Sequence, residues 1–411
     1  MSSAPKASLP VRIYLFFSSV GLATALLVVL MIETWLATLE QVDHGLHQTL
    51  LKYFNYKAWY VLPDAAALSD SLAGKYLPPL PGGYWVCALL VLNLILGGVI
   101  RIKKTGLKNI GVLLAHFGII FMVISGGITQ IGEKRGIMML KEGEQADFAQ
   151  DFINTTIEIS AIKDGKVEGF VHLIDDSNYT DLEGQKTRTV HLPSLPFDIE
   201  LQAFTRNGVP VSATSAAPER NEPVVDGWFF AARKPGTESE LDTPGIYARI
   251  IPKDDSVKGQ VAILSVASYQ PLTVRSKDAA YAVRLNKRIW PIPFQVRLDD
   301  ARTKYYPNTN KPASYESDIT RIEDGREMKK LIEMNEPMRY AGYTFFQRTM
   351  SGADPSSKEV AMSGFEVVRN PSDKWPKYSI IVAGFGLFLH FVLKLAGFVF
   401  GRRSSPKNPS L

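Results

Sequence analysis

Four long apolar blocks constrain the fold of this 411-residue chain more than any other feature of its sequence. They are Tyr14–Met31, Tyr84–Ile100, Ile110–Ile131 and Tyr378–Phe400. At ~1.5 Å of helix per residue, each can cross a hydrocarbon core about 30 Å thick, the second only just. Residues 131–375, by contrast, carry charges throughout and resemble ordinary globular sequence. The sequence therefore predicts a membrane protein with four spans and one large water-exposed domain.

The basic residues near the span ends predict the orientation. Lys and Arg in such positions are retained on the cytoplasmic side, and none of the three basic segments contains an acidic residue. With four spans all three segments lie on one side, so both termini are expected in the cytoplasm of an inner-membrane protein. A net charge of +5 then needs no nucleic-acid partner. The basic residues are Lys6, Arg12, Arg101, Lys103, Lys104, Lys108, Arg402, Arg403 and Lys407.

The first apolar block resembles a signal peptide in its basic start, but its apolar run is longer and no clear A-x-A cleavage site follows. We interpret it as an uncleaved anchor. The single cysteine, Cys87, lies within the second block, which excludes a disulfide framework and a CxxC thiol-exchange role for this chain.

The large domain is predicted to be mainly antiparallel β and sandwich-like, which makes the whole chain an α+β membrane protein. Short β-like runs recur between Gly, Pro, Asn and Asp clusters. They are TTIEISAI, KVEGFVHLI, FDIELQAFT, GIYARIIP, QVAILSVASY, FQVRLDDA, YTFFQRTM and GFEVVRN. The expected organisation is residues 1–34 (N-terminus and first span), 35–83 (extracytoplasmic segment at the membrane surface), 84–131 (two spans and a basic loop), 132–377 (extracytoplasmic β domain) and 378–411 (last span and tail).

One internal similarity leaves two interpretations open. LPSLPFDIELQAF and IWPIPFQVRLDDA share the pattern P-x-P-F-x-(I/V)-x-L, which places Phe197 and Phe294 on equivalent strand faces. The domain then consists either of two related lobes divided near 216–245, or of one lobe in which two edge strands are alike by chance.

Among the six histidines, His116 and His390 lie inside apolar blocks. His44 and His47 could share a helix face as a metal pair, although an exposed interfacial pair explains them better. His172 and His191 fall in β-like runs and suit surface or hydrogen-bonded positions. Ionisable residues within a bilayer usually face a bundle interior or a cofactor. His116 lies about 12 Å of helix from Lys108, and His390 about 15 Å from Phe400, so their depths are similar.

A water-poor site with one or two neutral imidazoles suits haem iron, which takes axial nitrogen ligands. Small residues near His116 would let a helix or a flat macrocycle approach: Gly118, Ser125, Gly126 and Gly127. A neutral imidazole bonded to a neighbouring helix is the alternative. No P-loop, Rossmann, G-x-S-x-G or HExxH motif indicates a hydrolase or transferase, and no discontinuous repeat indicates a transporter.

Several stretches resemble the ResB family, also called the CcsB half of the system II cytochrome c synthetase. YWVCALLVLNLILGGVIR is similar to the family's second span, LLAHFGIIFMVISGGI to its His-bearing third span, and GIMMLKEGE to the turn after it. LPFDIELQAF resembles its LPF strand, and SYESDITRIEDGREMKKLIEMNEPMRYAGYTFFQRTM its most characteristic run. The family's last span often ends in His-Arg-Arg, whereas Gly401 precedes Arg402 and Arg403 here and the histidine is His390.

The resemblance implies a function in which haem b is held in transit by His116, and by His390 if the displaced histidine serves. It implies a CcsA/ResC-type partner with a WWD domain, apocytochrome c as the acceptor of haem at CxxCH, and thiol reductant proteins. This chain has no WWD-like run, so it is not expected to be an enzyme by itself. The alternatives are a β-domain scaffold or envelope sensor without haem, and a divergent member that supports another redox complex.

Overall fold

The computed structural model describes residues 8–72, 74–100, 109–163, 166–182, 184, 186–218, 222–277, 279–352 and 360–401. The chain forms two compact units, a helical unit of residues 1–133 and 370–411 and a β domain of residues 134–369. Residues 370–377, expected in the β domain, belong to the helical unit. Most of the basic residues that predict the orientation lie outside the described residues, in segments 1–7, 101–108 and 402–411.

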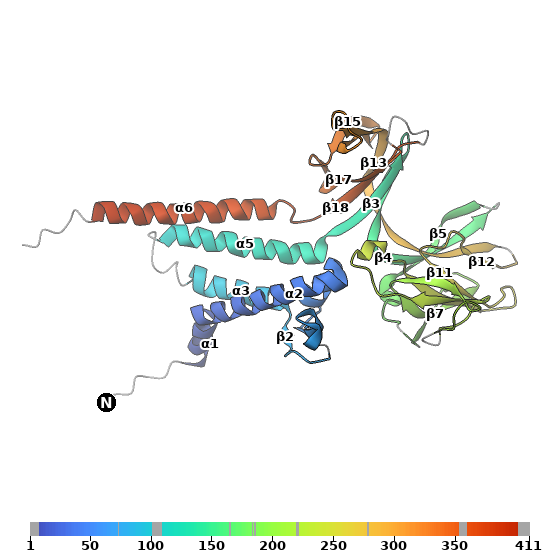
Figure 1. The fold of residues 1–411 in the computed structure, drawn as a ribbon, viewed down its shortest axis with the longest axis horizontal. Helices are drawn as coiled ribbons and strands as arrows, with labels where there is room; N and C mark the ends of the chain where they lie inside the picture. Colours follow the sequence, from blue (N-terminus) through green and yellow to red (C-terminus); the bar gives the residue numbers. More distant parts are fainter. Residues whose placement is uncertain are drawn as a thin grey trace, which may run out of the picture. The chain divides into compact units, whose positions relative to one another are not determined.

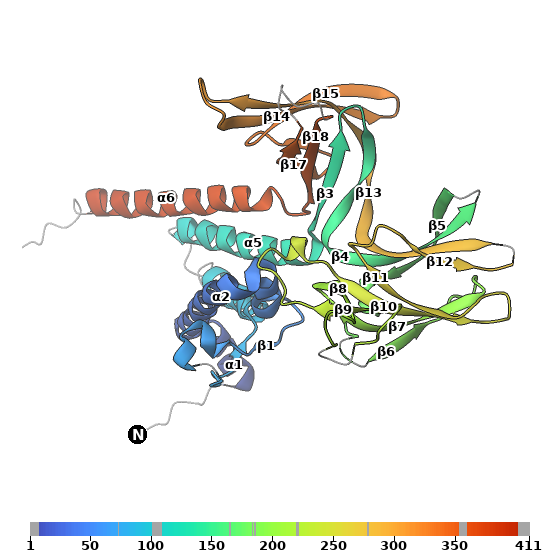
Figure 2. The same cartoon turned by 45° about the vertical axis from the view of Figure 1, so that its right-hand side comes forward.

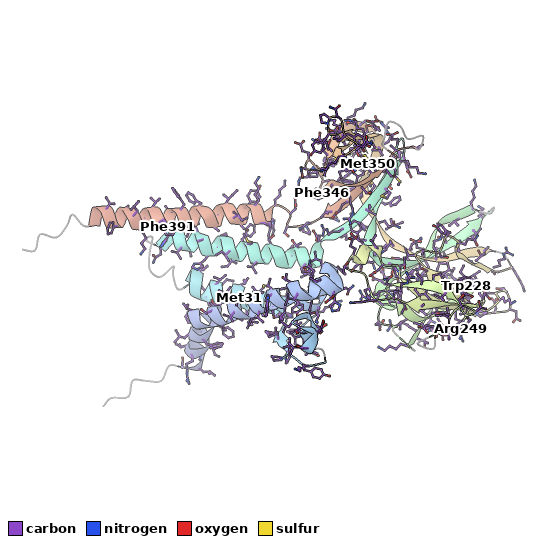
Figure 3. All side chains as sticks on the ribbon, in the orientation of Figure 1. Met31, Trp228, Arg249, Phe346, Met350 and Phe391 are labelled. Carbon is purple, nitrogen blue, oxygen red and sulfur yellow. The ribbon has the colours of Figure 1, made fainter. Side chains whose placement is uncertain are left out.

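Four helices of the helical unit are long and apolar enough to cross a membrane, which confirms the predicted α+β membrane protein (Figure 1). Their exposed faces carry large apolar side chains, such as Met31 and Phe391, which Figure 3 labels. The helices of the unit are α1 (Leu9–Phe17), α2 (Val20–Phe54), α3 (Gly83–Asn93) continuing as the π-helical η3 (Leu94–Ile100), α5 (Ile110–Gly132) and α6 (Trp375–Gly401).

The sequence predicts one continuous helix through the first apolar block. The structure instead has a break at Ser18 and Ser19, between α1 and α2. Ser19 adopts an extended conformation and its side chain accepts a hydrogen bond from the Leu22 N–H, so it caps α2. The side-chain amide of Asn93, on α3, donates to the carbonyls of Phe17 and Ser19 at 2.7 and 2.9 Å. A backbone break within an apolar bundle is tolerated only where such partners satisfy its polar groups.

Helix α2 reverses at Gly45, whose φ of 75° is the left-handed conformation that favours glycine. The residues after this reversal fold back onto the first part of α2 around a small core of Leu36, Ala37, Tyr53 and Val61. The segment before α3 also contains β1 (Tyr60–Val61), η1 (Ala65–Ala67), η2 (Asp70–Leu72) and β2 (Leu80–Pro81).

Helices α5 and α6 pack closely side by side through small residues (Figure 1). A Cβ on Gly118 would lie 2.6 Å from the Ala383 backbone nitrogen, and one on Gly386 would lie 2.5 Å from the Ala115 nitrogen. Farther along α5, Ser125 and Thr129 bond to Ser372 in the chain that leads into α6. Close backbone approach through Gly and Ala, with hydroxyls bonded between segments, is the usual way apolar helices associate in a membrane.

The β domain is built from antiparallel pairs, and each of the eight predicted β runs overlaps a strand, although QVAILSVASY is a strand only as far as Ser265. Its main sheet follows the order β15-β14-β13-β4-β3-β18-β17-β16, with β12 added to β13 and β5 to β4. A second sheet has the order β11-β10-β7-β6, and β8 pairs with β9. The strands are β3 (Lys134–Lys141), β4 (Gln145–Lys163), β5 (Lys166–Asp175), β6 (Thr187–Val190), β7 (Phe197–Thr205), β8 (Gly208–Ser212), β9 (Trp228–Ala232), β10 (Gly245–Pro252), β11 (Gln260–Ser265), β12 (Leu272–Arg275), β13 (Ala280–Tyr305), β14 (Pro312–Glu323), β15 (Arg326–Glu333), β16 (Met338–Tyr340), β17 (Tyr343–Ser351) and β18 (Met362–Arg369); the domain also contains the short helices η5 (Asp176–Asn178) and η6 (Ser239–Leu241).

The described residues of the domain form two separate hydrophobic cores, and the strands around each core are here called a lobe. In the first, one half of the long strands β4 and β13 packs face to face on the second sheet, and Phe197 is buried there. The second core, which holds Phe294, lies on the main sheet, and Ser317 on β14 bonds across it to Gln347 on β17 and Ser363 on β18. Strands β4 and β13 pass through both lobes (Figure 2). The stretch 216–245 does not divide the lobes, because it connects strands that belong to the first lobe.

Candidate functional site

His116 lies on α5 with its ring against η3. A Cβ built on Gly98 would lie 3.1 Å from Cγ of His116, so a larger residue there would press on the ring. The ring nitrogen Nδ1 is buried and has no hydrogen-bond partner among the described residues; the Val112 backbone one turn earlier is near but does not reach hydrogen-bonding geometry. Because Nδ1 is enclosed by protein, Nε2 is the nitrogen left for a ligand.

The wall opposite His116 has an unusual backbone. The segment Leu94–Ile100 is π-helical, and such segments often occur at functional sites. The other glycine of the pair, Gly97, faces the helix break: a Cβ there would lie 2.7 Å from the Ser18 carbonyl oxygen. The Asn93 side chain ties the same break to α3. The position of Gly98 beside His116 is therefore fixed through the junction of α1, α2 and η3.

His390 belongs to α6, and its backbone contacts α5 on a different side from His116. Its backbone packs against Gly111, where a Cβ would lie 2.5 Å from the His390 nitrogen, and its ring contacts Phe391 edge-on. His116 follows Gly111 by five residues, which is a rotation of roughly 140° around the helix. The His390 backbone thus contacts a face of α5 about 140° around the helix from His116, and any joint role of the two histidines in binding one metal stays a prediction.

The four small residues of α5 have separate roles. Gly118 contacts α6, and the Ser125 carbonyl accepts a hydrogen bond from Ser372. Gly126 and Gly127 instead border an apolar groove of about 530 Å³ between α3 and α5. The groove is lined by Phe54, Tyr84, Cys87, Ala88, Val91, Val123, Ile124, Gly126, Gly127, Ile128, Gln130 and Ile131.

The remaining histidines lie elsewhere. His44 is 3.6 Å from Asp64, and His191 is 2.9 Å from Asp198, while His172 pairs with Ile159 across the β4–β5 ladder. Within the described part of the chain, no group of three or more His, Cys, Asp and Glu side chains could hold a metal ion. A metal bound to this chain would therefore rely on an isolated side chain such as His116.

The characteristic run of residues 314–350 builds the second core of the β domain. Ser317 donates to the Gln347 side chain and bonds to Ser363 across the sheet, and Tyr343 stacks on Trp290 with ring centroids 6.1 Å apart. The turn containing Asn335 is held by two backbone hydrogen bonds between Glu333 and Glu336 and leads from β15 into β16. The contacts of these residues give the characteristic run a structural role, which is to form the second core of the β domain.

Two further buried ionisable groups lie on the long strands. Burial raises the pKa of Glu158, which accepts a hydrogen bond from the Asn286 side chain. Burial lowers the pKa of Lys287, whose ammonium donates to the Phe152 carbonyl. Each has a hydrogen-bonding partner that explains its position, so neither indicates a reactive centre.

Residues 252–361, from the end of β10 to the residue before β18, match the model of the ResB-like family. This part of the chain is similar to that family. Over 236 residues, or 57% of its length, the chain is 22% identical to Protein NrfI of Wolinella succinogenes. The aligned part is 22% of that relative, so the chain spans about a fifth of its length. The family resemblance expected from the sequence is confirmed. The matched residues lie in the β domain, and the roles of His116 and His390 remain predictions.

The sequence does not indicate the roles of Asn93 and Gly98, because both depend on contacts between helices. It also does not indicate that Glu33 and Glu40, two acids on α2, are fully buried. The signal that could have identified Glu33 and Glu40 is their seven-residue spacing, which places two acids on one face of a helix next to an apolar block.

Proposed function

We propose that this chain is a haem-handling subunit of a system II cytochrome c synthetase at the inner membrane. The observation that carries the proposal is the His116 ring, which is half-buried in an apolar helical unit and whose Nδ1 is buried without a hydrogen-bond partner among the described residues. An imidazole held in this way offers Nε2 as one axial ligand to haem iron, which is the cargo in this proposal. The ResB-like match supplies the cytochrome c context for that chemistry.

The residues of this chain have two tasks in the proposed function. Gly98 and the surrounding π-helical segment fix the orientation of the imidazole, and the apolar helices keep water away from it. A dry site with a fixed neutral ligand favours a haem iron in transit, because ligand orientation and solvent exclusion tune both affinity and potential.

One imidazole leaves the second axial position of haem to another group. The His390 backbone packs at Gly111, on a face of α5 about 140° around the helix from His116, so the proposal assigns the second ligand to a CcsA/ResC-type partner. That partner would also carry the WWD domain that this sequence lacks. Apocytochrome c would receive haem at its CxxCH thiols, kept reduced by thiol reductant proteins, with the β domain on the periplasmic side.

The test is a reduced-minus-oxidised absorption spectrum and a pyridine haemochrome assay on the full-length chain purified with its partner. We expect haem in the wild type, loss of most of it in His116→Gly, and recovery when imidazole is added. His390→Ala is the matched control and should retain its haem. A preparation without haem in either the wild type or the control would contradict the proposal and favour the scaffold alternative.

A further inference from the structure

Two acids on α2, Glu33 and Glu40, are both 0% exposed. Glu40 is fully partnered, because its carboxylate accepts hydrogen bonds from the Lys52 ammonium, the Tyr53 hydroxyl and the Asp64 N–H, each at 2.6 Å. Glu33 is different. Neither of its carboxyl oxygens has a hydrogen-bond partner within the part of the chain that the structure describes.

The space around Glu33 is closed by apolar groups. A Cβ on Gly83 would lie 3.0 Å from Oε2 of Glu33 and 2.5 Å from the Phe54 ring, so these groups meet at the start of α3. Ile32 and Leu36, the neighbours of Glu33 on α2, belong to the apolar cluster that also contains Phe54. The titratable groups coupled electrostatically to Glu33 are Tyr53, on the second part of α2, and Cys87, on α3.

The first turn of α3 could in principle stabilise a carboxylate, since its free N–H groups carry partial positive charge. No backbone N–H of that turn donates to Glu33, however. No cation of the described residues pairs with Glu33 either, whereas Lys52 pairs with Glu40. An ionised carboxylate without partners is strongly unfavourable in apolar surroundings, and such a group takes up a proton instead.

We propose that Glu33 is a proton-binding site within the helical unit, which holds a proton at neutral pH and exchanges it when Phe54 moves aside. Phe54 lies next to the carboxyl group at Gly83 and also lines the groove between α3 and α5, so its ring occupies the route that we propose from the groove to the carboxyl group. Proton release requires water or a cation at the carboxylate. Whether Glu33 holds a proton is thereby linked to the position of residues 46–54, the part of α2 after Gly45 that ends at Phe54.

The test uses infrared difference spectroscopy on the full-length chain, labelled with ¹³C at the glutamate carboxyl groups and held in lipid nanodiscs. Subtracting Glu33→Gln from the wild type at pH 7 should isolate the C=O stretch of a protonated carboxylic acid. Carboxylate stretches in that difference would overturn the proposal. Glu33→Asp also removes the labelled group and gives the same assignment if the glutamine variant does not fold.

Thermal unfolding of the same samples provides a second readout with a matched control. Glutamine is close in shape to a neutral glutamic acid, so Glu33→Gln should leave the unfolding temperature of the wild type unchanged. Glu40→Gln should lower it, because the charge that faces Lys52 is lost. An equal decrease in both variants would mean that Glu33 is ionised and stabilising, which contradicts the proposal.

Discussion

At the scale of single residues, Asn93 shows how one polar side chain permits a broken helix in an apolar setting. Its side-chain amide donates hydrogen bonds to the carbonyls of Phe17 and Ser19, on either side of Ser18, and the residue is 5% exposed. Removing it would take away the side-chain donor of the Phe17 carbonyl where water cannot replace it, while the Ser19 carbonyl would keep the Ala23 N–H at 3.3 Å.

Asn93→Leu is therefore expected to destabilise the helical unit by about 1–3 kcal/mol, the range for leaving buried polar groups unsatisfied. The measurement is the thermal unfolding midpoint of the purified protein. Leu92→Ala, at an exposed neighbouring position, is the control and should have a much smaller effect. An unfolding midpoint equal to that of the wild type would mean that the break is satisfied in some other way.

Asp198 makes the β domain sensitive to acid. Burial raises the pKa of this carboxyl, but hydrogen bonds from the Leu192 N–H, His191 and Lys253 outweigh burial and lower the pKa to about 2. An acid whose pKa is lower when folded stabilises the fold above its unfolded pKa of about 3.9, and this contribution is lost as the pH falls through 2.

Asp198→Asn should accordingly lower stability at pH 6 by about 1–3 kcal/mol, as expected for hydrogen bonds to a charged group. The difference from the wild type should shrink as the pH falls from 4 to 2. Acid titration of unfolding, followed by tryptophan fluorescence, measures it. Asp181→Asn, whose partner Arg188 is exposed, serves as control and should change little at either pH. A difference that does not depend on pH would contradict the assignment.

At the scale of elements, the contact between α5 and α6 depends on where glycines are placed. Gly118→Ala would put a methyl group 2.6 Å from the Ala383 backbone nitrogen, and the helices would have to separate. We expect a loss of about 1–3 kcal/mol, as for other overpacked sites. Gly126→Ala is the matched control on the same helix, because nothing lies within 4 Å of its Cβ. Equal unfolding temperatures for the two variants would exclude close α5–α6 packing.

Much of the element order could be read from the sequence, because long apolar blocks and alternating strands carry strong local patterns. The break at Ser18 and Ser19 could not, since both flanking helices are equally apolar and the deciding contact comes from Asn93. The length of β13 could not be predicted either, because Pro291 and Pro293 suggest a strand boundary. The strand continues through both prolines, and only its pairing with β4 is interrupted, between Pro291 and Val296. The position of His116 within a span was evident, whereas its neighbour Gly98 depended on tertiary packing.

At the scale of the whole molecule, the four candidate spans predict that the two chain ends lie on one side of the membrane and the β domain on the other. A reporter that is active only in the cytoplasm should be active when fused after Leu411 and inactive when inserted after Gly352. Alkaline phosphatase, active only outside the cytoplasm, should give the opposite pattern at the same two positions. Activity of the same reporter at both positions would contradict a four-span arrangement.

The long strand β13 has a consequence for the segment that defines the family likeness. Residues 252–361 include β13 but neither β4 nor β3 and β18, although β13 pairs with β4 through much of its length. Cut out of the chain, this segment would expose one edge of β13 as unpaired backbone, which invites strand-to-strand association between copies. The segment that matches the family model therefore leaves out strands that its longest strand needs as partners, so it is expected to persist only in chains that also keep those strands.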